Sequence, residues 1–109
     1  MKQIKAFVHP HRIAAVTDAL RDSGLCDISA GTGCYHLTVS TVQRLYTSPD
    51  PQQQHYSVVV AEPVVDEIKL ELICDDLLAD QLSQIIVQAG RSGTGWVFVS
   101  DIQGAAKIA

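Results

Sequence analysis

The segment that decides the fold is Ala89-Gly90-Arg91-Ser92-Gly93-Thr94-Gly95-Trp96-Val97-Phe98-Val99. It follows a pattern typical of an amphipathic helix, contains three glycines, and continues into an apolar run typical of a strand. Glycine tolerates positive φ and lets a ligand approach the backbone closely, so several amide groups can converge there on an anion. Taken alone, the segment is explained more simply as a helix C-cap followed by a tight turn.

The composition bounds the class of protein. The length of 109 residues predicts a single domain spanning residues 1–109, and the content of 47% hydrophobic and 18% charged residues predicts a globular one. A net charge of −4 without any cluster of lysine or arginine argues against binding of nucleic acid. The sequence has no run of membrane-spanning length and no signal-peptide pattern. Its three cysteines, odd in number and irregularly spaced, suit a reducing cytoplasm and argue against a disulfide framework.

The first half of the chain predicts two strands and a helix. Residues 2–8 alternate as a strand, Pro10 suits a helix start, and Gly24 suits the helix end. The apolar stripe of that helix consists of Ile13, Val16, Ala19 and Leu20. Residues 25–33 predict a loop, and Cys34 to Leu45 predicts the second strand. The polar residues 46–55, with two prolines, predict a projecting loop of the kind that often carries binding function.

The second half predicts a strand, a helix and a strand. The third strand is expected from Tyr56 to Cys74 with a break near Glu62-Pro63, because proline cannot donate to a ladder. Its residues 68–74 alternate cleanly between apolar and charged side chains. Asp75 and Asp76 suit an N-cap, and Gly90 suits the end of the following helix. The stripe of that helix consists of Leu78, Leu82, Ile85, Ile86 and Ala89. The fourth strand is expected over residues 96–102, followed by a loose tail.

The predicted order is strand–helix–strand–strand–helix–strand, which gives an α+β, ferredoxin-like βαββαβ sandwich. Its antiparallel sheet carries both helices on one face, so the other face has no cover within the chain. That open face is predicted to present Phe7, Val42 and Ile73 among polar neighbours. Burial of this apolar surface by self-association is therefore expected.

Three segments, in this order, resemble the PII family of signalling proteins. They are Met1-Lys2-Gln3-Ile4-Lys5-Ala6-Phe7-Val8-His9-Pro10, Glu67-Ile68-Lys69-Leu70-Glu71-Leu72-Ile73-Cys74-Asp75-Asp76, and Gly90-Arg91-Ser92-Gly93-Thr94-Gly95-Trp96-Val97-Phe98-Val99. The resemblance covers most of the chain except residues 26–33 and the projecting loop. It implies a cytoplasmic homotrimer that binds adenine nucleotides at subunit clefts. It also implies a role in nitrogen regulation, in which the projecting loop, residues 45–56, regulates a membrane transporter or an enzyme.

The resemblance also implies sites. The nucleotide would be bound by Gly90, Arg91, Ser92, Gly93, Thr94, Gly95, Trp96 and Lys107, and the partner by Arg44, Tyr46, Asp50 and His55. This chain departs from the family pattern at three places. It has Thr94-Gly95-Trp96 where Asp-Gly-Lys is usual, Glu67 where a phosphate-contacting lysine is usual, and only Lys107 as a basic residue of the C-terminal segment. We therefore expect a degenerate nucleotide site that favours ADP or AMP and binds ATP weakly.

Two other function classes were weighed. Divalent metal could be bound by His9 and His11 or by Cys34 and His36, each pair two residues apart, as in a metal-tolerance trimer of CutA-like architecture. Neither spacing is a recognised metal motif, and Cys74 is expected to be a buried hydrophobe. Tyr46 is a candidate modification site on the loop. Acylphosphatase shares the fold order, but His9-Pro10-His11-Arg12 lacks the glycine of its anion cradle. The sequence therefore predicts a regulator without catalytic activity.

Overall fold

A computed structural model describes residues 1–26, 33–45 and 54–109 as an α+β protein. The elements are β1 (Lys2–Val8), α1 (Ile13–Asp22), β2 (Cys34–Leu45), β3 (Gln54–Ser57), β4 (Glu62–Cys74), the 3-10 turn η2 (Asp76–Leu78), α2 (Ala79–Ala89) and β5 (Trp96–Asp101). The strands form one antiparallel sheet in the order β2-β4-β1-β5, and β3 also pairs with β4. This arrangement confirms the predicted ferredoxin-like fold.

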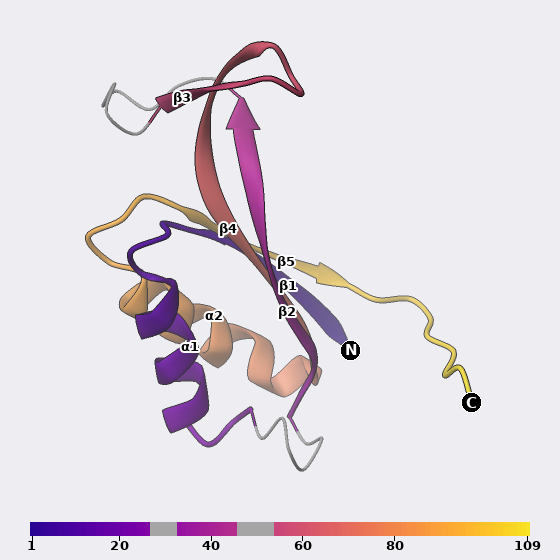
Figure 1. Ribbon diagram of the computed structural model, residues 1–109. Helices are drawn as coiled ribbons and strands as arrows, with labels where there is room; N and C mark the ends of the chain where they lie inside the picture. The colour runs from indigo at the N-terminus through magenta and orange to yellow at the C-terminus, as the bar shows by residue number, and fades with distance from the viewer. Residues whose placement is uncertain (27–32, 46–53) are drawn as a thin grey trace.

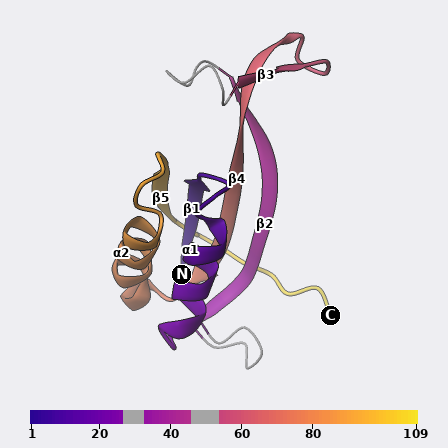
Figure 2. The same cartoon turned by 60° about the vertical axis from the view of Figure 1, so that its left-hand side comes forward.

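The core lies between the sheet and the two helices. Both helices cover the same face of the sheet, as predicted, and the other face is left open (Figures 1 and 2). Alternate strand residues such as Ile4 and Leu72 point into this core, where they pack with Leu20, Leu82 and Ile86 of the helices. The period of two in the strands and the apolar stripes of the helices therefore place the core as the sequence predicts. Cys74 is buried there as a free thiol, and its burial raises the pKa of that thiol.

The predicted third strand is in fact two strands. The chain reverses at residues 58–61, and β4 then begins at Glu62 and runs through Pro63 to Cys74. The expected break at the proline was wrong because Val58-Val59-Val60, a β-branched run that favours strand by propensity, forms the turn instead. β3 lies along the same edge of β4 as β1 does, since Gln54 pairs with Val65 and Val8 pairs with Ile68.

A three-stranded arm results from this pairing. We define the arm as residues 41–45 of β2, β3 with the turn after it, and residues 62–67 of β4. It extends away from the two helices, at the top of Figure 1. Val64 and Val65 are buried inside the arm, and so is Ser57, which donates a hydrogen bond from its Oγ to Oε1 of Gln43 at 2.7 Å.

The prediction for Asp75 and Asp76 is confirmed in part. Asp75 occupies the N-cap position of the 3-10 turn η2, which precedes α2, and Asp76 lies in its first turn, but Asp75 makes no side-chain capping hydrogen bond. The Asp76 carboxylate instead accepts a hydrogen bond from the N-terminal amine at 2.5 Å, and this hydrogen bond lowers the pKa of Asp76. An intramolecular cation therefore takes the carboxylate that the helix start was expected to use. At the other end of the helix Gly90 is the C-cap, as predicted.

The expectation of reduced cysteines was also wrong, because Cys26 and Cys34 form a disulfide with their Cα atoms 4.8 Å apart. Gly33 brings the two residues together. It has φ of +81°, and a Cβ atom there would lie 1.8 Å from the Leu25 carbonyl oxygen, so only glycine fits. Sequence spacing alone did not reveal this pairing, because the pairing depends on where the chain returns to the sheet.

Candidate functional site

The glycine loop, Gly90–Gly95, lies against the turn that connects β1 to α1. A Cβ atom at Gly93 would lie 2.6 Å from Cβ of His9, and one at Gly95 would lie 2.1 Å from the Phe7 carbonyl oxygen. Both glycines are therefore required for close packing. The positive φ expected of the glycines is found instead at Ser92, where φ is +78°. The glycines permit close approach, as predicted, but the approaching group is the chain's own backbone and side chains.

The loop's amide groups are partly engaged. The amides of Gly90, Arg91 and Gly93 donate to carbonyl oxygens of Ile86, Gln88 and Gly90, as expected at a helix end. Within the described part of the chain, Ser92 and Thr94 donate no amide hydrogen bond. The loop also follows the C-terminal end of α2, where the helix dipole disfavours an anion. The convergence of several amides on an anion stays a prediction, with Ser92 and Thr94 as the available donors.

Two arginines border the loop in different ways. Arg12 donates from Nη2 and Nε to the Ala89 carbonyl oxygen, at 2.7 and 3.2 Å, and so neutralises the end of α2. Arg91 is exposed and donates from Nη1 to Oε1 of Gln88 at 2.8 Å. Arg91 is therefore positioned beside the loop and keeps further guanidinium donors for a ligand.

The end of the loop opens onto a hollow in the open face of the sheet. This sheet hollow has a volume of about 430 Å³. Its lining residues are Phe7, Val42, Gln43, Arg44, Glu67, Thr94, Gly95, Trp96 and Phe98. Trp96 stacks on Phe98 with centroids 6.0 Å apart, and Phe98 meets Phe7 edge to face at 6.1 Å. The Trp96 side chain does not fill the hollow, because 71% of the residue is exposed.

The opposite wall of the sheet hollow belongs to the base of the arm. Arg44 of β2 places Nε 2.9 Å from Oε1 of Glu67 on β4, and Glu67 is only 8% exposed. The ion pair offsets the cost of burying that carboxylate. Glu67, noted in the sequence as a departure from the family pattern, is thus a partner of Arg44. Their cross-strand contact follows from the register of β2 against β4, in which Val42 pairs with Glu67.

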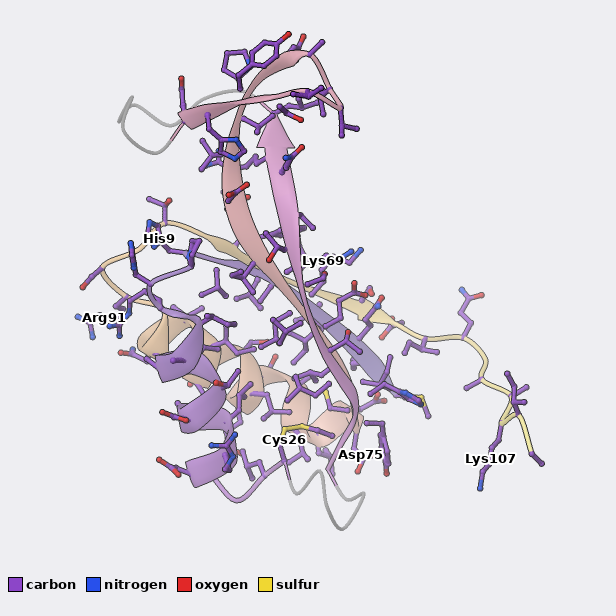
Figure 3. All side chains as sticks on the ribbon, viewed as in Figure 1. His9, Cys26, Lys69, Asp75, Arg91 and Lys107 are labelled. Atoms are coloured by element: carbon purple, nitrogen blue, oxygen red, sulfur yellow. A yellow bond between two sulfur atoms is a disulfide. The ribbon has the colours of Figure 1, made fainter. Side chains whose placement is uncertain are left out.

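A second hollow of about 360 Å³ lies on the other side of the glycine loop. It is bordered by Ile86 and Val87 of α2 and by Arg91. Lys107, predicted to belong to the same site, is placed elsewhere. It lies in the C-terminal tail, at the end of the molecule away from Arg91 (Figure 3), where it lines a separate hollow of about 550 Å³ with Tyr35 and His36. Within one chain, the structure therefore brings residues 90–96 together and leaves Lys107 apart.

Two of the four predicted partner-binding residues are described. Arg44 lies at the base of the arm. His55, predicted to lie at the end of the projecting loop, lies instead on β3, where its Nε2 is 2.8 Å from Oδ1 of Asp66 on β4. This hydrogen bond raises the pKa of His55. Tyr46 and Asp50 fall outside the described residues. Asp66 and Ser57 also stabilise the arm, but no sequence pattern predicts this role, because their partners are set by strand register.

The candidate metal ligands do not form one site. The imidazoles of His9 and His11 stack with centroids 5.0 Å apart, and Nδ1 of His9 accepts the His11 amide at 3.1 Å. Cys34 is buried in its disulfide, whereas His36 is exposed with φ of +51° beside a β-bulge, so the prediction that these two residues form a metal-binding pair was wrong. The described ranges contain no group of three or more metal-ligating side chains. Metal binding by His9 and His11 stays a prediction.

The described residues include no helix that is long and apolar enough to cross a membrane. No protein-family model matches the chain. Individual curated proteins do match it. The chain is 30% identical to a nitrogen regulatory protein P-II of Rhodobacter capsulatus, over 99% of this chain and 91% of that relative. Proteins of the same name from Rhodospirillum rubrum and Porphyra purpurea are 27% and 25% identical, with the same coverage.

These matches agree with the fold and with the three segments quoted from the sequence. They extend along nearly the whole chain, including the β1 start, β4 and the glycine loop. The low identity fits the departures at Glu67 and Trp96, which the structure places on the walls of the sheet hollow. On this combination of fold, local sequence and coverage, the chain belongs to the nitrogen regulatory protein P-II family.

Proposed function

We propose that this protein senses a small anionic molecule and regulates a partner protein through the projecting loop, residues 45–56. The observation that carries the proposal is the composition of the sheet hollow. One wall contains Thr94, Gly95 and Trp96 from the end of the glycine loop, and the other contains Gln43 and Arg44 from the base of the arm. A ligand between these walls would contact both the glycine loop and the strand that leads into the projecting loop. Its binding energy can therefore favour one conformation of the arm over another.

The proposed ligand is ADP or AMP, with ATP bound more weakly. Trp96 offers an exposed aromatic surface on which a purine ring can stack. The cationic groups nearby are few. Glu67 partly neutralises Arg44, Arg91 is held by Gln88, and Lys107 is distant within the chain. A triphosphate concentrates more negative charge than these groups can balance, whereas one or two phosphates need fewer charge-assisted hydrogen bonds.

We further propose that the protein is a homotrimer with its open faces turned inward. Phe7, Trp96 and Phe98 form an aromatic cluster on the open face, because Phe7 alternates along β1 with the buried Ala6 and Val8 and pairs with Trp96 of β5. Burial of Phe7 and Phe98 between copies would remove apolar surface from water, and the sheet hollow beside Trp96 would then lie in the cleft between two subunits, where a nucleotide can still enter. Static light scattering should report three times the mass of the chain at micromolar concentration. A stable monomer would contradict this assembly.

The proposed partner is a membrane transporter or a cytoplasmic enzyme, and the protein itself acts in the cytoplasm without catalysis. Support comes from the names of the relatives, which describe nitrogen regulatory proteins. The CutA-like metal-binding alternative loses one of its two ligand pairs, because Cys34 is buried in a disulfide. We therefore keep the regulatory function as the single proposal.

Isothermal calorimetry with ATP, ADP, AMP and divalent metal ions tests the proposal. Saturable binding is expected for ADP or AMP, and weaker binding for ATP. Arg44→Gln should weaken nucleotide binding by about tenfold, because it removes a charged hydrogen-bond donor from the wall of the sheet hollow. Gln88→Ala is the matched control, since Gln88 is exposed and does not line the sheet hollow. Binding of a metal ion without any nucleotide would instead favour the CutA-like alternative.

A further inference from the structure

The turn between β3 and β4 presents unusual residues to the solvent. We call residues 58–61, Val58-Val59-Val60-Ala61, the valine turn. Val58 is 87% exposed and Val59 is 93% exposed, at the end of the arm remote from both helices. Turns at such positions normally use glycine, asparagine, aspartate or serine, which satisfy the backbone and suit water. Consecutive apolar, β-branched side chains there therefore need an explanation other than turn formation.

The valine turn is held in one conformation. The Ala61 amide donates to the Ser57 carbonyl oxygen at 2.7 Å, and the Val60 amide donates to Ser57 Oγ at 3.2 Å. Ser57 Oγ in turn donates to Gln43 Oε1 of β2, so the turn is tied to the neighbouring strand. Ala61 adopts φ of +60°, which is unfavourable for a residue with a Cβ atom. A preformed apolar projection of this kind loses little conformational entropy when it is buried by another surface.

The charge beside the valine turn and the apolar area of its side chains indicate which kind of surface can bury it. Glu62 follows the turn, is exposed, and forms no ion pair with any described residue, so the rim of the projection is acidic. An anionic membrane surface would repel that carboxylate. Three valine side chains offer on the order of 300 Å², which is one part of the roughly 800 Å² per partner of a stable interface. Two copies meeting turn to turn would bring two Glu62 carboxylates together, so the projection suits a concave socket of opposite charge on a different protein.

We propose that the valine turn is an anchor that inserts into an apolar socket, rimmed by lysine or arginine, on a partner protein. This inference rests on the proposed regulatory function in requiring a partner, but it assigns recognition to residues 58–61, outside the loop 45–56. Burial of Val58 and Val59 supplies the affinity, and Glu62 selects a basic rim.

A photo-crosslinking amino acid at position 59, introduced in the full chain in its host cells, tests the proposal. Leu77 is the control position, because it is 94% exposed and lies on η2 rather than on the arm. The adduct formed from position 59 and absent from position 77 is identified by mass spectrometry, and that protein is then purified. Its affinity for the wild-type chain is compared with its affinity for Val59→Asp, Leu77→Asp and Glu62→Lys.

The proposal expects Val59→Asp to weaken binding by at least about tenfold, Leu77→Asp to leave it unchanged, and Glu62→Lys to weaken it less than Val59→Asp does. Adducts only between copies of this chain would overturn the proposal, and so would the absence of a specific adduct. Binding to vesicles of phosphatidylcholine and phosphatidylglycerol that Val59→Asp abolishes would do the same. Nucleotide calorimetry on Val59→Asp separates the two proposals: loss of partner binding with unchanged nucleotide binding concerns the anchor alone.

Discussion

The strands β2 and β4 run through both the arm and the rest of the molecule, the body covered by the two helices, but their side chains are buried differently in these two regions. In the body, β4 residues such as Leu70 and Leu72 are completely buried under two helices. In the arm, the same strand has no helix over it, and the neighbouring turn exposes Val58 and Val59 almost fully. One continuous strand is therefore buried in two ways: its second half packs under the helices, and its first half buries Val64 and Val65 inside the arm, next to the exposed turn.

The largest predicted difference between the two regions is in stability. Leu72→Ala should lower the free energy of unfolding by about 2–5 kcal/mol, because it leaves a cavity in the body's core. Val59→Ala removes methyl groups from an exposed turn and should change that free energy by less than about 0.5 kcal/mol. Urea denaturation followed by circular dichroism measures both. Equal losses would mean that the valine turn is buried in solution, for instance by another copy.

A smaller effect is predicted where the body meets the glycine loop. Gly95→Ala should lower the free energy of unfolding by about 1–3 kcal/mol, because its Cβ would overlap the Phe7 carbonyl oxygen. Gly104→Ala is the control, since a Cβ there meets no atom within 4 Å. If both variants unfold at the same urea concentration as the wild-type protein, Gly95 does not lie close to the Phe7 carbonyl oxygen in solution.

The smallest effect is a pH dependence confined to the arm. The hydrogen bond to Asp66 raises the folded-state pKa of His55 above its unfolded value, so the ion pair stabilises the arm fully below about pH 6.5. This stabilisation is lost as the pH rises through the folded-state pKa. A histidine NMR titration should place the pKa of His55 above that of the same residue in Asp66→Asn. Coincident titration curves would show that the pair does not form in solution.

Much of the body is predictable from sequence because its signals are local. The ends of β1 and β2 follow from alternation, Gly24 takes a φ of +73° just after α1, and Gly90 caps α2. These features need only the period of a strand or helix and the special φ or flexibility of glycine.

The features that cannot be predicted from the sequence depend on strand register or on the backbone path that brings distant residues together. The valine turn was missed because its residues favour a strand, although Ser57 and Gln43 hold them in a turn. Pairing of Cys26 with Cys34 requires the backbone path at Gly33. Trp96 is a predicted ligand-binding residue, but its position opposite Arg44 across one hollow follows from how β1, β2, β4 and β5 align.

Fluorescence of Trp96 tests most directly whether the sheet hollow binds a small nucleotide between the glycine loop and the base of the arm. Trp96 is the sole tryptophan, and it lines both the sheet hollow and the second hollow, so a variant of Arg44, which lines only the first of these two, assigns a fluorescence change to the sheet hollow. Titration with ADP should change that fluorescence saturably. Arg44→Gln should shift the midpoint of this titration, whereas the control Gln84→Ala, on the solvent side of α2, should keep the wild-type midpoint. Unchanged Trp96 fluorescence at millimolar ADP and AMP, in a protein that is folded by circular dichroism, would contradict the account.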